Sequence, residues 1–488
     1  MPTIQSIDYL AIAPPLVLAI AALAVLVLDA FRPRSVWTSV AALGAVLASA
    51  AVEVALAVDR PHRTFCVGDS CSYVVDTFTV LFQAVMLLAG VVVVLLAMIE
   101  VRETRLPAGE FYFLLLAALS GALTLAAGRD LITLVVSLEV VSLPLFALVA
   151  LRRYDGRSTE AGLKMFLVSV ISTAVMLFGI SLVYGATGTM FLEPISAALN
   201  RPGTPQGVAA AGVVLVLVGF GFKVSAVPFH FWAPDTYQGA PIAVAAFLSV
   251  ASKAAGFAGL ILVLTVAFGP LRNVWGPVVA VLAAVTMTAG NLVALRQKTA
   301  MRLLAWSSIA QAGYMLAPLG VAAGTPALRE LTAATVGYVA IYAAMNLGVF
   351  AVVSFVGWRG RYGGGLIEDY RGMVRDHPAA AIALAFFLAC LAGLPPGLAG
   401  LFAKIVVFRG VLAGGYGWLA VIMAVNTVLG LYYYLAWASR LFAQRADAPS
   451  VQFGRMPAYL TAAIMVAAAG TLLTSFVPQV VLGVAPGG

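Results

Sequence analysis

Four ionisable residues lie inside long apolar stretches of this sequence, where a charged side chain needs an explanation. They are Glu139 in LVVSLEVVSLPLF, Lys223 in GFGFKVSAVPFHFW, Lys253 in LSVASKAAGF and Lys404 in GLFAKIVVF. A charge at the middle of a bilayer costs roughly 2.5–3.5 kcal/mol on insertion scales, so such residues usually face a cavity, a partner or an ion path. The four residues therefore predict a route for protons through a membrane.

Two of these charges are followed by a proline at the same distance. Pro144 comes five residues after Glu139, and Pro228 comes five residues after Lys223. A proline within a helix leaves the carbonyl four residues earlier without its donor, and in lipid that carbonyl needs water or another polar group. The spacing predicts a hydrated backbone defect beside each charge. The simpler alternative is that the prolines only kink their helices.

Glu139 and Lys223 together provide a means of holding and releasing a proton. Loss of water disfavours the charged form of a buried lysine, and a nearby carboxylate favours it. At a separation of about 6 Å and an effective dielectric constant of about 20, that attraction is roughly 3 kcal/mol. Movement of Glu139 away from Lys223 would then turn a proton holder into a proton donor.

Other polar side chains in apolar segments are candidates for carrying protons or water between the charges. His230 is a candidate relay because histidine exchanges protons near neutral pH, with a structural role as the alternative. Each of the others is individually more often a helix–helix hydrogen bond: Ser249, Ser252, Ser307, Ser308, Gln311, Tyr314, Tyr342, Asn346 and Asn426. The charged residues nearer segment ends are expected to snorkel to the surface: Asp29, Glu53, Glu100 and Arg409.

The composition places these residues in a membrane protein. Of the 488 residues, 62% are hydrophobic and 10% are charged, whereas a soluble domain carries roughly 25% charged residues. The net charge of +8 is explained by basic loops and does not require nucleic acid as a partner. The sequence has neither a glycine-rich nucleotide motif in the right context nor a cysteine cluster for iron–sulfur chemistry. It therefore predicts no cofactor, no metal and no redox centre in this chain.

The apolar segments predict an all-α polytopic fold with about fourteen membrane-spanning helices, because one helix needs roughly 20 residues to cross the bilayer core. An even number of spans puts both termini on the same side. The expected spans are 8–30, 36–58, 75–99, 111–128, 131–151, 161–186, 207–231, 240–268, 275–295, 302–322, 332–356, 378–413, 416–439 and 456–483.

The distribution of lysine and arginine orients these spans. One set of loops contains 18 of the 28 basic residues and the other set contains 6. The basic set belongs in the cytoplasm, so both termini are expected on the outer side of a plasma membrane. The loop with Cys66 and Cys71 then also lies outside, where a disulfide can persist, although the sequence leaves open whether the two are bonded.

Two spans are expected to be broken. Pro228 interrupts the seventh, and the GLPPG stretch at 393–397 interrupts the twelfth. Corresponding interrupted spans indicate inverted repeats, and an offset of five spans gives two five-helix units of opposite orientation. The expected organisation is an N-terminal three-helix segment, two repeats and a C-terminal helix, at 1–110, 111–268, 275–440 and 456–488.

Several motifs resemble the antiporter-like membrane subunits of respiratory complex I, the bacterial NADH–quinone oxidoreductase. They are SLEVVSLPLF, LVYGATGT, FKVSAVPFHFWAPDTYQGAP, RLLAWSSIAQAGY and GLPPGLAGLFAKI, and the resemblance covers nearly the whole chain. It implies a fourteen-helix fold with two inverted repeats. It also implies that Glu139, Lys223, Lys253 and Lys404 form a central polar axis for proton translocation.

The resemblance is nearest to the branch called subunit N. Subunit M usually has glutamate at the position of Lys404, and subunit L has a C-terminal lateral helix that is not seen here. Two residues depart from the family pattern: Met301 stands where a lysine is frequent, and Gln311 stands where a histidine is frequent. Because glutamine does not take up a proton at ordinary pH, the relay at this point is expected to depend on water.

The leading hypothesis is a proton-translocating subunit driven by NADH oxidation and quinone reduction elsewhere in the complex. FMN, iron–sulfur clusters and quinone are then expected in other subunits, and subunit M-like and small K-like membrane proteins are the expected neighbours. One alternative is a subunit of a multisubunit cation/proton antiporter. A second is a non-conducting structural or assembly subunit, which Met301 and Gln311 would suit.

Overall fold

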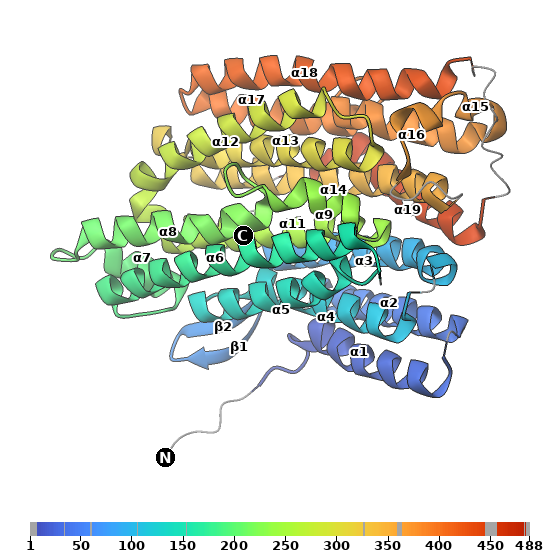
Figure 1. Ribbon diagram of the computed structural model, residues 1–488. Coiled ribbons are helices and arrows are strands. Elements are labelled where there is room, and N and C mark those ends of the chain that lie inside the picture. Colours follow the sequence, from blue (N-terminus) through green and yellow to red (C-terminus); the bar gives the residue numbers. More distant parts are fainter. Residues whose placement is uncertain are drawn as a thin grey trace.

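The computed structural model describes residues 7–33, 35–58, 61–104, 106–152, 154–325, 327–358, 364–444, 456–482 and 484. Several arginines counted for the orientation lie outside these ranges: Arg34, Arg60, Arg105, Arg153, Arg359, Arg361, Arg445 and Arg455. Most of the helices run side by side, with α1 at the bottom of Figure 1 and α18 at the top.

Twelve helical segments of the described chain are long and apolar enough to cross a membrane. Eleven of them are α1 (Ala13–Phe31), α2 (Val36–Val58), α3 (Thr77–Thr104), α4 (Ala108–Ala127), α5 (Leu131–Val149), α6 (Gly156–Thr187), α8 (Gln206–Val224), α12 (Arg272–Ala294), α14 (Leu328–Trp358), α18 (Gly417–Phe442) and α19 (Ala458–Phe476). The twelfth is a composite helix of α10 (Ile242–Phe247), η1 (Leu248–Ser252), α11 (Lys253–Leu262) and η2 (Val263–Ala267).

The two remaining predicted spans are also helical. The span expected at 302–322 is α13 (Ala300–Gly320), which carries several of the candidate relay residues. The span expected at 378–413 consists of α16 (Pro378–Ala392) and α17 (Leu398–Ala413). Each of the fourteen predicted spans therefore corresponds to a helix or a broken helix.

The shorter elements lie between the spans and were not predicted. Two strands, β1 (His62–Val67) and β2 (Ser70–Val75), form an antiparallel hairpin closed by a disulfide between Cys66 and Cys71. The short helices are α7 (Leu192–Leu199), η3 (Gly269–Leu271), η4 (Ala322–Gly324), η6 (Ile367–Tyr370), α15 (Met373–Asp376) and η7 (Pro478–Val480). A further short helix, α9 (Trp232–Gly239), follows the break after α8.

Both predicted helix breaks are confirmed. The first comes at Ser225, which ends α8 in the left-handed conformation (φ 62°). The second comes at Gly393 (φ 80°), which ends α16. Pro228 therefore lies in the turn between α8 and α9 and is not a kink within a continuous helix. Pro144 behaves differently, because α5 continues through it to Val149.

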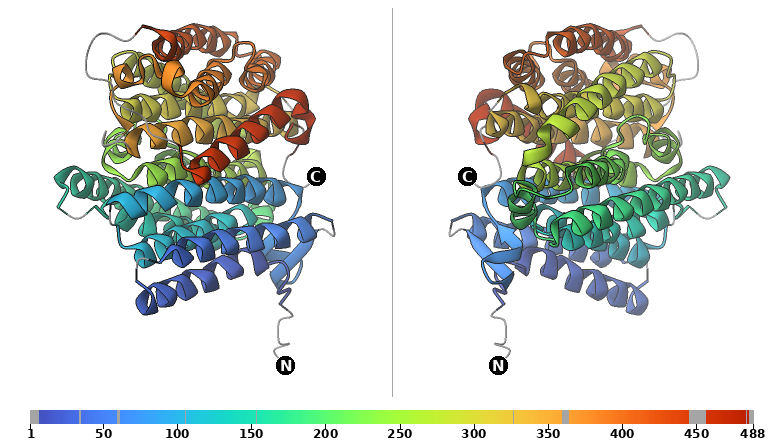
Figure 2. Two further views of the ribbon diagram at one scale, coloured as in Figure 1. Left: turned by 90° about the vertical axis from the view of Figure 1, so that its right-hand side faces the viewer. Right: turned by 90° about the vertical axis from the view of Figure 1, so that its left-hand side faces the viewer.

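The centre of the bundle is formed by the composite helix and α14, whose spans are wholly buried. Helix α3 packs against both of them. Helix α19 crosses the other helices obliquely (Figure 2) and packs on α14 and α3. These contacts fix the two helices that carry Lys253 and several of the candidate relay residues.

Glu100 positions the start of the composite helix. It is buried and pairs with Arg152 at 2.7 Å, and its two carboxylate oxygens accept the backbone N–H groups of Ile242 and Ala243 at 2.9 and 3.0 Å. A carboxylate at a helix N-terminus is favourable because it satisfies free N–H groups and complements the helix dipole. The expectation that Glu100 snorkels is therefore wrong. Glu53 does not snorkel either, because it is only 3% exposed.

Candidate functional site

Glu139 and Lys223 lie close together but do not form a contact ion pair. The Lys223 ammonium donates to the Ser142 hydroxyl at 2.8 Å, and that hydroxyl donates to the Leu138 carbonyl at 2.7 Å. Glu139 accepts a hydrogen bond from Thr173 of α6 at 2.7 Å. The carboxylate still acts on the Lys223 ammonium through space. The two charges are therefore coupled, but neither is fixed to the other.

Lys223 lies at the end of a half-helix, in the last turn of α8. The last carbonyls of a helix have no intrahelical donor and carry partial negative charge, which favours a cation there. Its aliphatic stem packs on the composite helix at Gly256, where an added Cβ would come within 2.8 Å of the Lys223 Cγ. A larger residue at Gly256 would displace the lysine.

Lys253 connects the first half of the chain to the second. Its ammonium donates to the Ser308 hydroxyl at 2.5 Å and to the Ser308 carbonyl at 2.7 Å. The same hydroxyl accepts from Tyr342 at 2.9 Å and bonds with Tyr237 at 3.3 Å. Ser308 of α13 therefore bonds with side chains of three other helices, namely Lys253 of the composite helix, Tyr342 of α14 and Tyr237 of α9.

The composite helix is irregular immediately before Lys253. Residues Leu248–Ser252 form a π-helical turn, and such turns occur frequently at functional sites. The Ser249 hydroxyl in this turn accepts from Asn346 of α14 at 2.9 Å. The Asn346 carbonyl oxygen is buried and has no hydrogen-bond partner in the part of the chain that the structure describes. A buried acceptor of this kind is a suitable position for a water molecule.

Gln311 lies one turn along α13 from Ser308 and is fully engaged. Its carbonyl oxygen accepts from Tyr338 at 2.7 Å, and its amide donates to Tyr434 at 3.2 Å and to the Leu391 carbonyl at 3.4 Å. The Tyr434 hydroxyl also bonds with Ser307 at 2.5 Å. The departure from histidine therefore leaves an ordered hydrogen-bonded residue that cannot itself carry a proton.

Lys404 binds the end of the other half-helix. It lies on α17, and its ammonium reaches back to the last carbonyls of α16, at 2.6 Å for Ala392 and 3.3 Å for Leu391. It also lies 5.6 Å from the centre of the Tyr314 ring, within cation–π range. Gly393 leaves room for this contact, since an added Cβ would meet the lysine at 3.1 Å. Lys223 and Lys404 thus both lie at a helix break, but only Lys404 binds the end carbonyls of a half-helix, since the Lys223 ammonium donates to Ser142 of α5.

The three lysines also share the chemical type of their partners. Each ammonium donates to hydroxyl or carbonyl oxygens, and within the described ranges none of them lies within ion-pair distance of a carboxylate. A direct carboxylate partner would hold a buried lysine in its charged form. Partners that are themselves neutral leave both the charged and the neutral lysine accessible.

His230 lies in the turn between α8 and α9. It is 6% exposed and packs edge-on against Trp306 at 5.4 Å, and its Nδ1 has no hydrogen-bond partner among the described residues. Its hydrogen bonds do not join it to the lysines within the described chain. Its role as a relay stays a prediction.

An ion cluster holds α9 in place at the end of the bundle. Asp235 bonds to Lys164 of α6 at 2.7 Å and to Arg302 of α13 at 3.0 Å, and Arg302 also donates to Gln238. Partial burial acts to raise the pKa of Asp235, but the hydrogen bonds and charges of Lys164 and Arg302 outweigh it and lower the pKa. The cluster is therefore ionised at neutral pH, and its stabilisation is lost only as the pH falls below the usual aspartate range near 4.

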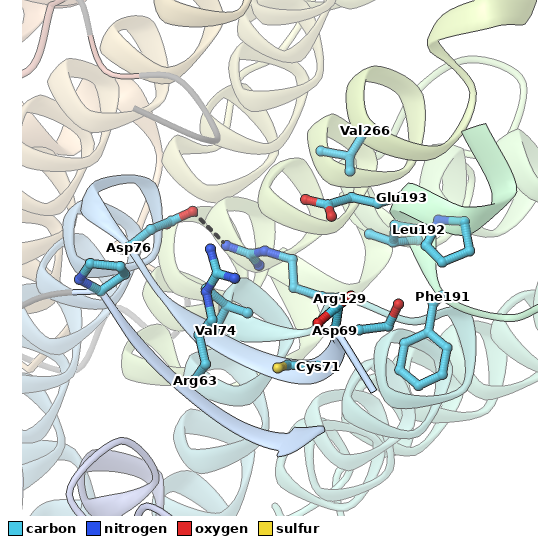
Figure 3. Close-up of a pocket in the computed structure, with 13 residues that line it drawn as sticks. Arg63, Asp69, Cys71, Val74, Asp76, Arg129, Phe191, Leu192, Glu193 and Val266 are labelled. Carbon is cyan, nitrogen blue, oxygen red and sulfur yellow. Dashed lines mark hydrogen bonds and ion pairs between the residues drawn. The ribbon is translucent and has the colours of Figure 1, made fainter. Parts of the chain in front are cut away.

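A charged cavity of about 390 Å³ lies at the hairpin end of the bundle (Figure 3). Arg129, which lies between α4 and α5, binds the junction of the hairpin and α3, donating to Asp76 and to Thr79, each at 3.0 Å. Burial acts to raise the pKa of Asp76, but the charge of Arg129 and the hydrogen bond from the Thr79 backbone outweigh it, so the pKa is lowered overall. Hydrogen bonds of the described residues do not link this cavity to the lysines, so its charges serve to anchor the hairpin.

The charges could be located from the sequence, but several of their partners could not. Ser142 could have been recognised from the sequence because it lies one turn after Glu139, and Tyr237 because it lies in the PDTYQGAP motif. Tyr434 could not, since it is the last of three consecutive tyrosines and the sequence does not indicate which one faces inward. The missed contact residues are Ser142, Thr173, Tyr237, Tyr338, Leu391 and Tyr434.

The fold and sequence match known membrane subunits. Residues 128–430 match the family described as "NADH:quinone oxidoreductase/Mrp antiporter, TM". The chain is 52% identical to "NADH-quinone oxidoreductase subunit N 2" of Streptomyces griseus, over 98% of this chain and 93% of that protein.

Two solved structures have the same fold. A chain of respiratory complex I from Thermus thermophilus with bound aureothin is 32% identical, with a TM-score of 0.75, over 96% of this chain and 98% of that one. A chain of the Mrp complex from Dietzia sp. is 21% identical with a TM-score of 0.82, over 97% and 96%, and at that identity it supports the fold alone. The chain therefore belongs to the NADH:quinone oxidoreductase/Mrp antiporter membrane family, among the relatives of NADH-quinone oxidoreductase subunit N.

Proposed function

We propose that this chain is the proton-translocating subunit N of the membrane arm of a bacterial NADH–quinone oxidoreductase. The observation that supports this most directly is that Lys223, Lys253 and Lys404 are all buried and have neutral hydrogen-bond partners, with Glu139 near Lys223. The identity to subunit N relatives extends over nearly the full length of the chain. The complex would supply the driving reaction, with FMN, iron–sulfur clusters and quinone bound in other subunits.

Each protein group has a definite part in this proposal. Glu139 sets the charge state of Lys223 through space, so a change at Glu139 makes Lys223 take up or release a proton. The Ser308 hydroxyl gives Lys253 a route into the second repeat. Lys404 receives the proton at the end of α16. His230 and Gln311 are secondary, His230 as a relay and Gln311 as a positioning residue.

The domain organisation is part of the same proposal. We infer that residues 111–268 and 275–440 are two inverted five-helix repeats, preceded by three helices at 1–110 and followed by the helix at 456–488. The presence of a broken helix and a buried lysine in each half supports this division.

The proposed orientation places both termini outside the bacterial plasma membrane. The excess of basic residues in one set of loops supports it. The disulfide between Cys66 and Cys71 supports it too, because such bonds persist on the oxidising side of a membrane. Labelling of a cysteine introduced at Ala436 provides the test, since a charged reagent must then reach it from the cytoplasmic face.

A protein neighbour is proposed to cover α5 and α6. Glu139 is only partly buried, and a carboxylate facing lipid would be costly. Large apolar side chains surround it, including Val136 and Leu143 of α5, each more than half exposed. We infer that a membrane-arm subunit of the K-like or M-like type lies against this face.

Cross-linking tests which neighbour covers α5. A photoreactive group attached to a cysteine at Val136 in the assembled complex is expected to link this chain to a K-like or M-like subunit. The matched control is a cysteine at Val421, which is 64% exposed on α18 at the other end of the bundle. Lipid adducts alone from position 136, in a fully assembled complex, would contradict the neighbour assignment.

Reconstitution separates the proposed function from secondary antiport. In liposomes, the assembled complex is expected to acidify the lumen only when NADH and quinone are present. An antiporter subunit would instead exchange protons for a cation down an imposed cation gradient without NADH. Exchange driven by a sodium or potassium gradient alone, abolished by Lys223→Ala, would favour antiport and overturn the proposal.

A further inference from the structure

A second cavity lies at the basic-loop end of the second half of the chain. It has a volume of about 410 Å³ and lies between the end of α12, the start of α13, the segment around η6 and the last turns of α18. Lys298, Glu368 and Arg440 line it together with Tyr433 and Trp437. Its charged rim and its aromatic inner wall are suited to water entering from the surface.

The inner wall of this cavity reaches well into the bundle. Tyr433 lies nine residues before the end of α18, which at about 1.5 Å per residue is on the order of 13 Å along the helix. Its side chain is 4% exposed, and its hydroxyl donates to Asn291 of α12 at 3.0 Å. The Trp437 indole N–H is buried and lacks a hydrogen-bond partner within the described ranges. A buried free donor on the cavity wall is a natural contact for an ordered water.

A series of contacts leads from Tyr433 toward Lys404. The Tyr433 and Tyr434 rings lie 4.4 Å apart, and their phenol groups interact. Tyr434 bonds to Ser307 and accepts from Gln311, and Gln311 and Lys404 both donate to the Leu391 carbonyl. The cavity is thus connected to Lys404 by hydrogen bonds, except between the two phenols, whose rings are in contact.

We propose that this cavity is the aqueous opening through which Lys404 exchanges protons with the basic-loop side, with Tyr433 and Tyr434 as its relay. The inference rests on the proposed function, because it assigns access to a lysine that must titrate. For a transfer, the Tyr433 hydroxyl turns from Asn291 toward Tyr434, and each phenol then accepts one proton on its cavity side and gives one away on its inner side. The neutral Lys404 amine gains a proton and neither tyrosine changes its net charge.

The last step of this route requires a water molecule. The Leu391 carbonyl only accepts hydrogen bonds, and the Gln311 amide does not titrate, so neither can pass a proton from Tyr434 to Lys404. The Gln311 hydrogen bond to Leu391 is long, at 3.4 Å, and therefore weak. A water that replaces this contact completes the route, and Gln311 is therefore a positioning residue.

The relay is tested by removal of single hydroxyl groups from neighbouring tyrosines. In inverted membrane vesicles, Tyr433→Phe is expected to lower NADH-driven proton pumping at least about threefold, because a positioned transfer group is lost while the ring packing is kept. Tyr432→Phe is the matched control, since Tyr432 also lines the cavity but is 67% exposed, and among the described residues no hydrogen bond joins its hydroxyl to Asn291, Tyr434 or Gln311. It is expected to pump normally, with both variants compared at equal amounts of assembled complex.

The opening is tested by chemical access. A cysteine at Ala436, on the cavity wall, is expected to react with a small permanently charged thiosulfonate added to inverted vesicles, and the reaction is expected to slow pumping. A cysteine at Ser439, exposed on the same helix, is expected to react without loss of pumping. The native cysteines give little background, because Cys66 and Cys71 are bonded and Cys390 is buried.

The outcomes distinguish this inference from the proposed function. Normal pumping by Tyr433→Phe and by the labelled Ala436→Cys complex, with pumping abolished in Lys404→Ala, would overturn the opening and leave the function in place. Normal pumping by Lys404→Ala would overturn the role of the lysine and the opening with it. If the cavity instead binds an anionic lipid, lipid removal and resupply would change pumping while Tyr433→Phe would not, which also contradicts the opening.

Discussion

Replacement of Lys223 by alanine is expected to abolish NADH-driven proton pumping, or to reduce it at least about tenfold, in a complex that still assembles. Lys223 is the lysine on which Glu139 acts, and its ammonium is positioned by the Ser142 hydroxyl. Loss of a proton-transfer group at a fixed place in a series typically slows transfer by about 10²-fold or more. The measurement is quenching of a pH-sensitive dye in inverted vesicles, normalised to the amount of assembled complex.

Lys223→Arg distinguishes a proton carrier from a structural charge. Arginine keeps the positive charge but does not release its proton in a protein. If Lys223 only balances Glu139, the arginine variant is expected to pump well; if Lys223 carries protons, it is expected to fail as the alanine variant does. Unchanged pumping in Lys223→Ala would reject the central role of this residue.

The spans of the fold could be predicted because each depends on a local property. A continuous apolar stretch of sufficient length forms a helix in lipid, since its backbone hydrogen bonds must be satisfied within the segment. The breaks at Ser225 and Gly393 could be placed to within a few residues from nearby proline and glycine. The hairpin from His62 to Val75 and the short helix α9 could not, because they are too short to carry a clear periodic signal.

The charges of the site could be predicted, but their geometry could not. A lysine in an apolar helix can be recognised from the sequence alone. Its charge is energetically unfavourable in a membrane, so it requires a compensating environment. Its partner depends on which residues of other helices pack against it. Ser308 was one of several polar candidates, and only the packing of α13 against the composite helix makes it the partner of Lys253. Glu139 and Lys223 were expected to attract each other across a gap, but the sequence did not show that Thr173 would bind the carboxylate and Ser142 the ammonium.

The two broken helices hold their lysines in different ways. The hydrated backbone defect expected beside Lys223 stays a prediction, whereas at the second break the end of the half-helix itself binds the ammonium. At Lys404 the last carbonyls of α16 hold the ammonium directly. At Lys223 the lysine belongs to the last turn of α8. A helix C-terminus stabilises a cation without a carboxylate, so the ammonium is bound but can still release its proton.

The Lys253→Met variant is expected to lose as much pumping as Lys223→Ala. Methionine has a similar length and no charge, so it preserves the packing of the wholly buried composite helix while removing the ammonium. In the described chain, Lys253 is the lysine whose ammonium donates from the first repeat to a residue of the second. Without it, a proton that reaches Lys223 has no charged residue through which to pass to Lys404.

Two further variants on the same contacts make the result specific. Ser308→Ala removes the hydroxyl but leaves the Ser308 carbonyl as an acceptor for Lys253, so pumping is expected to fall by about fivefold, the equivalent of about 1 kcal/mol, which is the lower end of the cost of an unsatisfied partner. Ser249→Ala, one turn earlier, removes a buried hydroxyl that bonds to Asn346 and not to Lys253, and it is expected to retain most of the pumping. Equal losses in all three assembled variants would indicate general damage to the buried core, and near-normal pumping by Lys253→Met would show that protons bypass the connection between the two repeats.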